Sequence, residues 1–468
     1  MGTGALSYLS AVAKAGFFLK DLKLPELKLS RTQVIALSFF GIIIAGTLLL
    51  TLPFAAKNGQ WTSFGDAFFT ATSATCVCGL VVVDTWTHWT LFGQLVILAM
   101  IQIGGLGFIT LSVFAMVILR RKIGLNRREI IRETFGSMQM AGSIKFLQRI
   151  VWGTLIVEGS GALLLCFRFI PDFGWIKGIY YSIFHSISAF CNAGFDLMGT
   201  LEPYCSLTKY YGDTLVNAVV MALVVIGGLG FLVWDDIIIN GLKFRKYMLH
   251  TKIVLTSSAV LVFGGALLFW LCERNNILAG MSAKEQILSS MFLSVSPRTA
   301  GMNTVDIAGL TDASKVLTMI FSFIGGSPGS TAGGVKTTAI IVLLVYIKSY
   351  VLRERGCRIF KRRLESDAVN KACIVVFINL GLTLVAMVAI MMAQKNLALS
   401  DIAVEAFSAI GTVGISTGVT RDLNGLSRLV IIMLMYFGRV GSLTFALSFS
   451  ESRKRAKIDY PVEQITVG

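Results

Sequence analysis

The stretch Thr72-Ser-Ala-Thr-Cys-Val-Cys-Gly79 is a short, semi-apolar segment that ends in glycine, and three later segments of the chain end in the same way. The later stretches are Ser188-Ala-Phe-Cys-Asn-Ala-Gly194, Ser296-Pro-Arg-Thr-Ala-Gly301 and Gly411-Thr-Val-Gly414. Their final glycines follow one another at intervals of 115, 107 and 113 residues. Such a nearly constant period indicates an internal repeat, so we predict four copies of one unit.

Long apolar stretches flank each of these segments. Of the 468 residues, 55% are hydrophobic and 15% are charged, and the mean hydropathy is +0.74. This composition is far from that of soluble domains, and apolar stretches of this length cross about 30 Å of hydrocarbon as helices. Each glycine-ended segment is too short to cross, so it re-enters the membrane or lies on it. The sequence predicts eight spans in four pairs, at about 33–52 and 91–119, 150–170 and 214–234, 252–272 and 315–347, and 371–393 and 426–449.

Basic segments separate the pairs of spans. The formal net charge is +16, and positive-inside topology together with attraction to anionic lipids explains the basic segments without a nucleic-acid partner. Both termini then face the cytoplasm, and we expect no cleaved signal peptide. The predicted order is a cytoplasmic N-terminus (1–32), repeat 1 (33–119), a basic cytoplasmic loop (120–149), repeat 2 (150–242), repeat 3 (243–347), a second basic cytoplasmic loop (348–370), repeat 4 (371–450) and a cytoplasmic tail (451–468).

The four re-entrant loops predict one central pore. Irregular backbone is tolerated at membrane depth where protein buries it or where it lines a water-filled cavity. We therefore predict an all-α polytopic membrane protein in which four tandem helix–pore loop–helix repeats stand in a pseudo-fourfold arrangement around one pore, with eight spans and four re-entrant pore helices.

Backbone carbonyls of these loops are suited to bind a cation that has lost its water. Glycine permits the dihedral angles that aim successive carbonyls inward, and the C-terminal end of each short helix favours positive charge. Close helix packing is the alternative explanation for the four glycines. The predicted filter residues are Val77, Cys78, Gly79, Asn192, Ala193, Gly194, Thr299, Ala300, Gly301, Thr412, Val413 and Gly414.

Two further features recur with the same period. An aspartate follows each of the four glycines within two to eight residues: Asp84, Asp196, Asp306 and Asp422. These aspartates either form an acidic outer mouth that concentrates cations or are ordinary polar loop residues.

A glycine-rich marker also follows in each unit, for which helix packing is again an alternative explanation. The markers are Gly104-Gly-Leu-Gly107, Gly227-Gly-Leu-Gly230, Gly325-Gly-Ser-Pro328 and Gly438-Arg-Val-Gly441.

The third marker begins the interruption Gly325-Gly-Ser-Pro-Gly-Ser-Thr-Ala-Gly-Gly-Val-Lys336 in the second span of repeat 3. Proline and five glycines predict a break in the helix, and a charge within a membrane span is functional by default. Our hypothesis is that the 325–335 segment is a gate below the filter, and that Arg439 adds a positive barrier or holds the loop closed. Snorkelling to the cytoplasmic interface is the alternative for Lys336. The predicted gate residues are Gly325, Gly326, Ser327, Pro328, Gly329, Ser330, Thr331, Ala332, Gly333, Gly334, Lys336 and Arg439.

Over nearly its full length the chain resembles the Ktr/Trk/HKT superfamily of potassium transporters, most closely the bacterial KtrB-type pore subunit. The four glycine-ended stretches, continued to Thr85, Asp196, Asn303 and Gly418, carry this resemblance, although Cys78 stands where the family pattern has threonine. The resemblance implies potassium uptake across the bacterial plasma membrane, since glycine in all four loops is associated with potassium selectivity. It also implies the gate arrangement just described.

The resemblance further implies a homodimer on a cytoplasmic ring of nucleotide-binding regulatory subunits. ATP and ADP would bind the partner and not this chain, with ATP favouring activity, ADP opposing it and sodium stimulating uptake. Whether sodium crosses or only activates stays open. The basic loops at 120–149 and 348–371 either dock the regulator or contact anionic lipid.

Two other functional classes are weaker. An ion-coupled symporter of an organic solute also has repeats and broken helices, but its repeats are usually two and often inverted. An enzyme is disfavoured because the chain has three histidines and none of the common catalytic motifs, so we predict no catalytic residues. The eight cysteines lack the paired spacing of a zinc site, so the expected metal is potassium at the filter.

Overall fold

The computed structural model describes residues 31–107, 143–354 and 356–441. The predicted N-terminal segment before Arg31, most of the first basic loop, the tail and the C-terminal parts of the spans 91–119 and 426–449 lie outside the described residues. The remaining predictions can be compared with the structure element by element.

Four long apolar helices match the first span of each predicted pair. Helices α2 (Arg31–Thr51), α8 (Ser143–Phe173) and α17 (Ser366–Ala393) are continuous. The first span of the third pair contains a π-helical turn. It consists of α12 (Leu249–Ala259), the turn η5 (Val260–Gly264) and α13 (Gly265–Glu273). Within the described ranges, these four are the helices that are each long and apolar enough to cross a membrane.

The helices at the second span of each pair are shorter or broken. They are α5 (Leu91–Leu106), α10 (Thr214–Leu229) with α11 (Phe231–Asn240), α15 (Asp312–Phe323) with α16 (Thr337–Val351), and α19 (Gly425–Val440). The predicted span at 214–234 is not one straight helix, because α10 and α11 meet at an angle of 94°. Gly230 lies at this bend with a φ of 95°, a conformation that glycine adopts without strain.

A short helix stands between the two spans of each pair: α3 (Phe64–Thr75), α9 (Trp175–Cys191), α14 (Ala283–Val295) and α18 (Leu399–Gly411). Side-chain caps begin two of them, since the Ser63 hydroxyl accepts from Asp66 N and Ser282 forms a capping box with Glu285. The remaining elements are η1 (Pro53–Ala55), α4 (Thr85–His88), η2 (Met198–Thr200), η3 (Thr208–Tyr210), η4 (Phe244–Lys246), η6 (Val419–Asp422) and the antiparallel strands β1 (Arg358–Ile359) and β2 (Arg362–Arg363).

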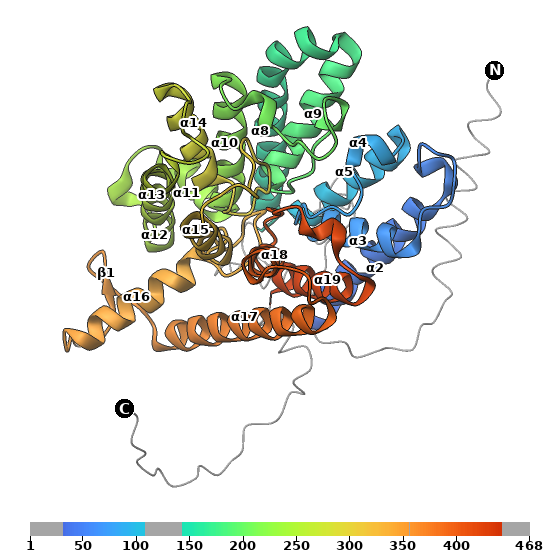
Figure 1. Cartoon of the computed structure of the whole chain (residues 1–468). Coiled ribbons are helices and arrows are strands. Elements are labelled where there is room, and N and C mark those ends of the chain that lie inside the picture. Colours follow the sequence, from blue (N-terminus) through green and yellow to red (C-terminus); the bar gives the residue numbers. More distant parts are fainter. Residues whose placement is uncertain (1–30, 108–142, 355, 442–468) are drawn as a thin grey trace, which may run out of the picture.

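The contacts between these units follow a closed order. Helix α5 contacts α9, α10 contacts α14, α15 contacts α18, and α19 of the last unit contacts α3 of the first. In Figure 1 the groups α2–α5, α8–α10, α12–α15 and α17–α19 accordingly follow one another around the molecule. The C-terminal ends of α3, α9, α14 and α18 therefore belong to one central region.

The polarity of the surface is that of a membrane protein. Large apolar side chains on the long helices are exposed, among them Leu163 at 62% and Phe377 at 73%. Large aromatic side chains close to the central region are fully buried, including Phe69, Trp89 and Phe190. Apolar exposure on this scale would not be stable in water but is expected where lipid covers the helices.

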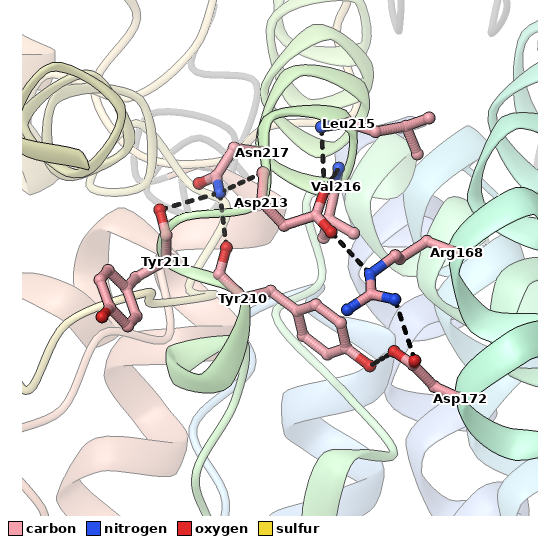
Figure 2. A network of polar contacts seen from close by, with 8 residues as sticks. All are labelled: Arg168, Asp172, Tyr210, Tyr211, Asp213, Leu215, Val216 and Asn217. Atoms are coloured by element: carbon pink, nitrogen blue, oxygen red, sulfur yellow. Dashed lines mark hydrogen bonds and ion pairs between the residues drawn. The ribbon is translucent and has the colours of Figure 1, made fainter. Parts of the chain in front are cut away.

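A network of polar side chains organises the connection from α9 to α10 (Figure 2). Arg168 of α8 pairs with Asp213 through Nε at 2.7 Å and with Asp172 through Nη1 at 3.0 Å, and the Tyr210 hydroxyl donates to Asp172 at 2.8 Å. Asp213 in turn caps α10 by accepting from Leu215 N and Val216 N. The network therefore holds one end of the connecting segment that begins after Gly194.

Candidate functional site

The glycines that end the four predicted filter loops lie against one another and form a closed ring, called here the glycine ring. A Cβ atom placed on each glycine would lie 2.1 to 3.0 Å from a carbonyl oxygen of the next loop. The pairs are Gly79 with Ala193 O, Gly194 with Ala300 O, Gly301 with Val413 O, and Gly414 with Cys78 O. The last loop returns to the first, and a side chain at any of the four glycines would crowd the main chain of the next loop.

All four loops share one backbone pattern. The ring glycines have φ angles of 93°, 71°, 73° and 90°. The residue two positions before each glycine is also left-handed, at Val77 (55°), Asn192 (60°), Thr299 (80°) and Thr412 (51°), whereas the residue between is not. Because positive and negative φ angles alternate along the loop, successive N–H groups point to one side of the chain and the carbonyls point to the other.

The N–H groups of the loops point back at the short helices. Ser73 O accepts from Cys78 N at 2.8 Å, and the Ser73 hydroxyl accepts from Gly79 N at 3.0 Å. The fourth loop repeats both bonds at the same lengths with Ser408, Val413 N and Gly414 N. Since the donors face the helices, the carbonyls point away from them, and one carbonyl oxygen of each loop lies close to the glycine of a neighbouring loop.

The serines that make these bonds were not among the predicted site residues. Ser188 and Ser296 serve the second and third loops, where their carbonyls accept from Ala193 N at 2.8 Å and Ala300 N at 2.9 Å. Their hydroxyls donate to the main chain just after the glycine, Ser188 to Phe195 O at 2.6 Å and Ser296 to Met302 O. A sequence signal exists, because a serine stands six residues before three of the glycines and five before Gly301.

A cavity of about 380 Å³ opens on the side of the ring that the outgoing segments reach. All four ring glycines line it, together with Asp84, Asp196 and Asp306. Asp422 does not line it, and Arg421 does, with its guanidinium 4.4 Å from the ring of Tyr204. We call it the acidic cavity, since three of the four predicted carboxylates meet there.

Two of these carboxylates have defined partners. Asp84 accepts from Thr87 N at 2.7 Å and from Tyr204 N at 3.0 Å, and Asp196 accepts from Met198 N at 2.9 Å. Burial raises the pKa of the Asp196 carboxyl to about 7, with a further contribution from the nearby Asp84. The charge of the acidic cavity therefore changes near neutral pH.

The segment 325–336, called here the inner loop, joins α15 to α16 without helix and lies on the other side of the ring. Ser327 N donates to Gly228 O at 3.0 Å, and the Thr331 hydroxyl donates to Phe190 O at 3.1 Å. The side chains of Thr331 and Asn192 are hydrogen-bonded at 3.1 Å. A Cβ on Gly333 would lie 2.0 Å from the hydroxyl of Thr412, so the inner loop touches two of the predicted filter residues.

The two charged residues predicted for a gate both bind carbonyls of this region. Arg439 of α19 donates to Thr331 O of the inner loop, and to Gly104 O and Gly105 O (3.1 Å) at the end of α5. Lys336 Nζ donates to Ala332 O at 2.8 Å and to Gly333 O at 3.3 Å. Both side chains line a second cavity of about 290 Å³, called here the basic cavity. Arg439 thus ties the inner loop to the first unit.

The marker glycines pack against the short helices. A Cβ on Gly104, Gly227 or Gly438 would lie 2.0 to 2.1 Å from a carbonyl oxygen, that of Thr75, Phe190 or Ile410 respectively. This geometry supports close packing, the alternative that the sequence left open for the markers.

Comparisons with known proteins agree with a transport function. The family described as "TrkH: Cation transport protein" matches residues 8–458. The chain is 41% identical to the potassium/sodium uptake protein NtpJ of Enterococcus hirae over 94% of this chain and 98% of that protein. It is 37% identical to the Ktr system potassium uptake protein B of Bacillus subtilis over 96% of this chain and 99% of that protein. The solved structure of the potassium transporter TrkH from Vibrio parahaemolyticus shares the fold, with a TM-score of 0.71 at 19% identity, and the match covers 91% of this chain and 86% of that one.

Proposed function

Because this chain belongs to the TrkH family of cation transport proteins, we propose that it is the pore-forming subunit of a potassium uptake system in the bacterial plasma membrane. The family and the relatives are transporters, which confirms that the chain is a multi-pass membrane transporter and not an enzyme. The observation that carries the finer proposal is the closed glycine ring, since one chain supplies four loops of the same backbone conformation to one centre.

In this proposal the glycine ring is the selectivity filter. Carbonyls of the twelve predicted filter residues replace the hydration shell of potassium, while hydrogen bonds to the four serines hold the loops against the short helices. Glycine at all four positions is the feature that the family resemblance associates with potassium. The short helices act as pore helices whose C-terminal ends favour a cation.

The acidic cavity is then the outer mouth. Asp84, Asp196 and Asp306 raise the local concentration of cations before they reach the ring. With this side outward, the basic cavity and both termini face the cytoplasm, as the distribution of lysine and arginine predicts.

The inner loop is the proposed gate. It lies across the path below Asn192 and Thr412, and Arg439 fastens it to the end of α5 while adding positive charge. A cation passes when the loop moves aside, which requires that the bonds of Arg439 to Thr331 and Gly104 break.

Control by a partner completes the proposal. The similar B. subtilis protein is named as one component of a Ktr system, which supports a partner subunit for this chain. As the family resemblance implies, the proposed assembly is a homodimer of this chain on a cytoplasmic ring of nucleotide-binding subunits. ATP and ADP bind that ring, and sodium stimulates uptake. The basic loop at 348–370 is the proposed docking site within the described residues, with anionic lipid as the competing partner.

The test is uptake of rubidium tracer by potassium-uptake-deficient bacteria that produce the full chain with its regulatory partner. We expect uptake that potassium inhibits and that needs no organic solute. Uptake that depends on an organic co-substrate would contradict the proposal and favour a symporter.

A further inference from the structure

The four short helices differ at one buried position beside the glycine ring. Three residues before the serine that holds each loop, the chain has Thr70, His185, Leu293 and Glu405. Each of the four side chains is at most 3% exposed. Because the carbonyl of each serine accepts from an N–H group of its loop, these positions correspond on the four short helices, and the side chains there can be compared.

Glu405 binds the segment that leaves the fourth loop. Its carboxylate accepts hydrogen bonds from the hydroxyls of Ser416 and of Thr420, the latter at 2.7 Å. Ser416 itself accepts from Gly418 N at 2.8 Å. Since Ser416, Gly418 and Thr420 line the acidic cavity, Glu405 supports this wall of the cavity from behind.

His185 does the same for the second loop. Its Nδ1 lies 2.7 Å from Tyr181 O, and its Nε2 accepts from Leu197 N at 3.3 Å. A neutral imidazole with the proton on Nδ1 satisfies both contacts at once. Leu197 follows Gly194 by three residues, so this histidine also holds an outgoing segment from behind.

The first and third loops have no such support from the corresponding position of their own helices. Leu293 is apolar, and within the described residues the Thr70 hydroxyl has no hydrogen-bond partner. The outgoing segments of these loops are held from the side by the connection after the second loop. Tyr204 N donates to Asp84 at 3.0 Å, and Asn303 N donates to the Ser206 hydroxyl at 3.1 Å.

The order of the ring makes this difference meaningful. Gly194 and Gly414 are not neighbours, because Gly79 and Gly301 stand between them on either side. The two loops braced from behind therefore face each other across the ring, as do the two that are held from the side.

We infer that Glu405 and His185 are positioning residues of the ring, which fix two opposite outgoing segments and so help to determine which cation the carbonyls fit. The inference rests on the proposed function of the ring as a filter. Carbonyls distinguish cations of different size when their positions and number are maintained, and a segment tied to a buried side chain resists inward movement around a smaller ion.

The experiment measures inhibition of rubidium uptake by potassium and by sodium in Glu405→Leu, Glu405→Gln and the matched control Thr70→Val. Glu405→Leu removes the acceptor for two hydroxyls, so we expect the preference for potassium over sodium to fall about tenfold. Glu405→Gln keeps an acceptor oxygen and should retain most of the preference. Thr70→Val should leave it unchanged.

Two further variants cover the case in which Glu405→Leu does not fold. Thr420→Val removes one donor to the carboxylate, and His185→Phe removes the acceptor for Leu197 N. Both should lower the preference for potassium in the same direction. A wild-type preference in all folded variants would overturn the inference, whereas a wild-type chain that takes up no rubidium would instead overturn the proposed function.

Discussion

The glycine ring and the layer beneath it come from the same four units but are built differently. In the ring, every loop has the same alternation of backbone hand, and in every loop a serine carbonyl accepts from a loop N–H group. In the layer beneath, three units reach a marker glycine with positive φ, namely Gly107, Gly230 and Gly441, after which the second unit bends by 94°. The third unit instead supplies the inner loop, and the fourth alone among these markers carries an arginine, Arg439.

The difference follows from what the two layers are proposed to do. A ring that surrounds an ion needs equivalent oxygens from each side, so every loop is under the same steric constraint at its glycine. A gate needs one movable element and one restraint, and each of these can come from a single unit. Mutations of the four ring glycines should therefore have similar effects on ion selectivity. The effect of a mutation beneath the ring should depend on the unit in which the residue lies.

The largest effect is expected in the ring. Gly414→Ser places a Cβ 2.1 Å from Cys78 O at a residue with a φ of 90°, and strain at such positions is about 1–3 kcal/mol before any clash. We expect the preference for potassium over sodium to fall at least about tenfold in rubidium-uptake competition, and Gly79→Ser, Gly194→Ser and Gly301→Ser to shift it in the same direction. Gly65→Ser is the control, since a Cβ there has no neighbour within 4 Å. Selectivity that is indifferent to all four ring substitutions would refute the filter assignment.

The next effect concerns Arg439. Arg439→Ala removes the hydrogen bonds to Thr331 O, Gly104 O and Gly105 O, and hydrogen bonds of charged groups contribute about 1.5–3 kcal/mol each. We expect the inner loop to open more often and rubidium flux per folded molecule to rise several-fold. Shortening the inner loop by deletion should raise flux as well.

Arg439→Lys separates the two proposed roles of the arginine. Lysine keeps the positive charge but lacks the planar fork that reaches two units at once. Flux as high as in Arg439→Ala would assign the effect to the lost contacts, and wild-type flux would assign it to charge. Unchanged or lower flux in well-folded Arg439→Ala protein would count against the gate.

A smaller effect is expected from pH at the acidic cavity. The pKa of Asp196 is raised to about 7, so this carboxyl is mainly neutral at an external pH of about 6 and mainly charged at about 8. The apparent KM for potassium should therefore fall as the pH rises, by at most about fivefold for one partly solvated charge. Asp196→Asn should flatten this dependence, whereas Asp422→Asn, which does not line the cavity, should keep it. A pH profile identical in wild type and Asp196→Asn would remove Asp196 from the mouth.

The smallest effect is expected in the network around Arg168 at the start of α10 (Figure 2). The Arg168 side chain is 44% exposed, and ion pairs of this kind contribute about 0–1 kcal/mol. Arg168→Met should lower the thermal stability in detergent slightly and leave the ion preference unchanged. A changed preference would show that the α9 to α10 connection acts on the ring more strongly than its side contacts suggest.

Periodicity and hydropathy predicted the first span of each pair and the residues of the ring. They did not predict the bend at Gly230, because an apolar pattern gives the length of a span but not the sign of φ at one glycine. The interruption before Lys336 was visible, since proline and repeated glycines mark a break directly.

Contacts between distant segments were the part that could not be predicted. Asp422 was grouped with the other carboxylates by spacing alone, yet the short helix η6 brings Arg421 to the cavity in its place. Tyr204 N and Asp84 are 120 residues apart, and nothing local to either residue indicates their hydrogen bond. Ser73 lies in the first quoted stretch, and Glu405 lies shortly before the fourth. The role of each residue depends on which part of the loop lies against its side chain in the folded chain.

Anomalous diffraction from the purified full chain in rubidium salt tests the central proposal most directly. We predict a rubidium peak on the axis of the glycine ring, in contact with carbonyl oxygens of Cys78, Ala193, Ala300 and Val413, and its loss in Gly414→Ser. Rubidium bound elsewhere in the chain, with none in the ring, would contradict the assignment of these four loops as the filter.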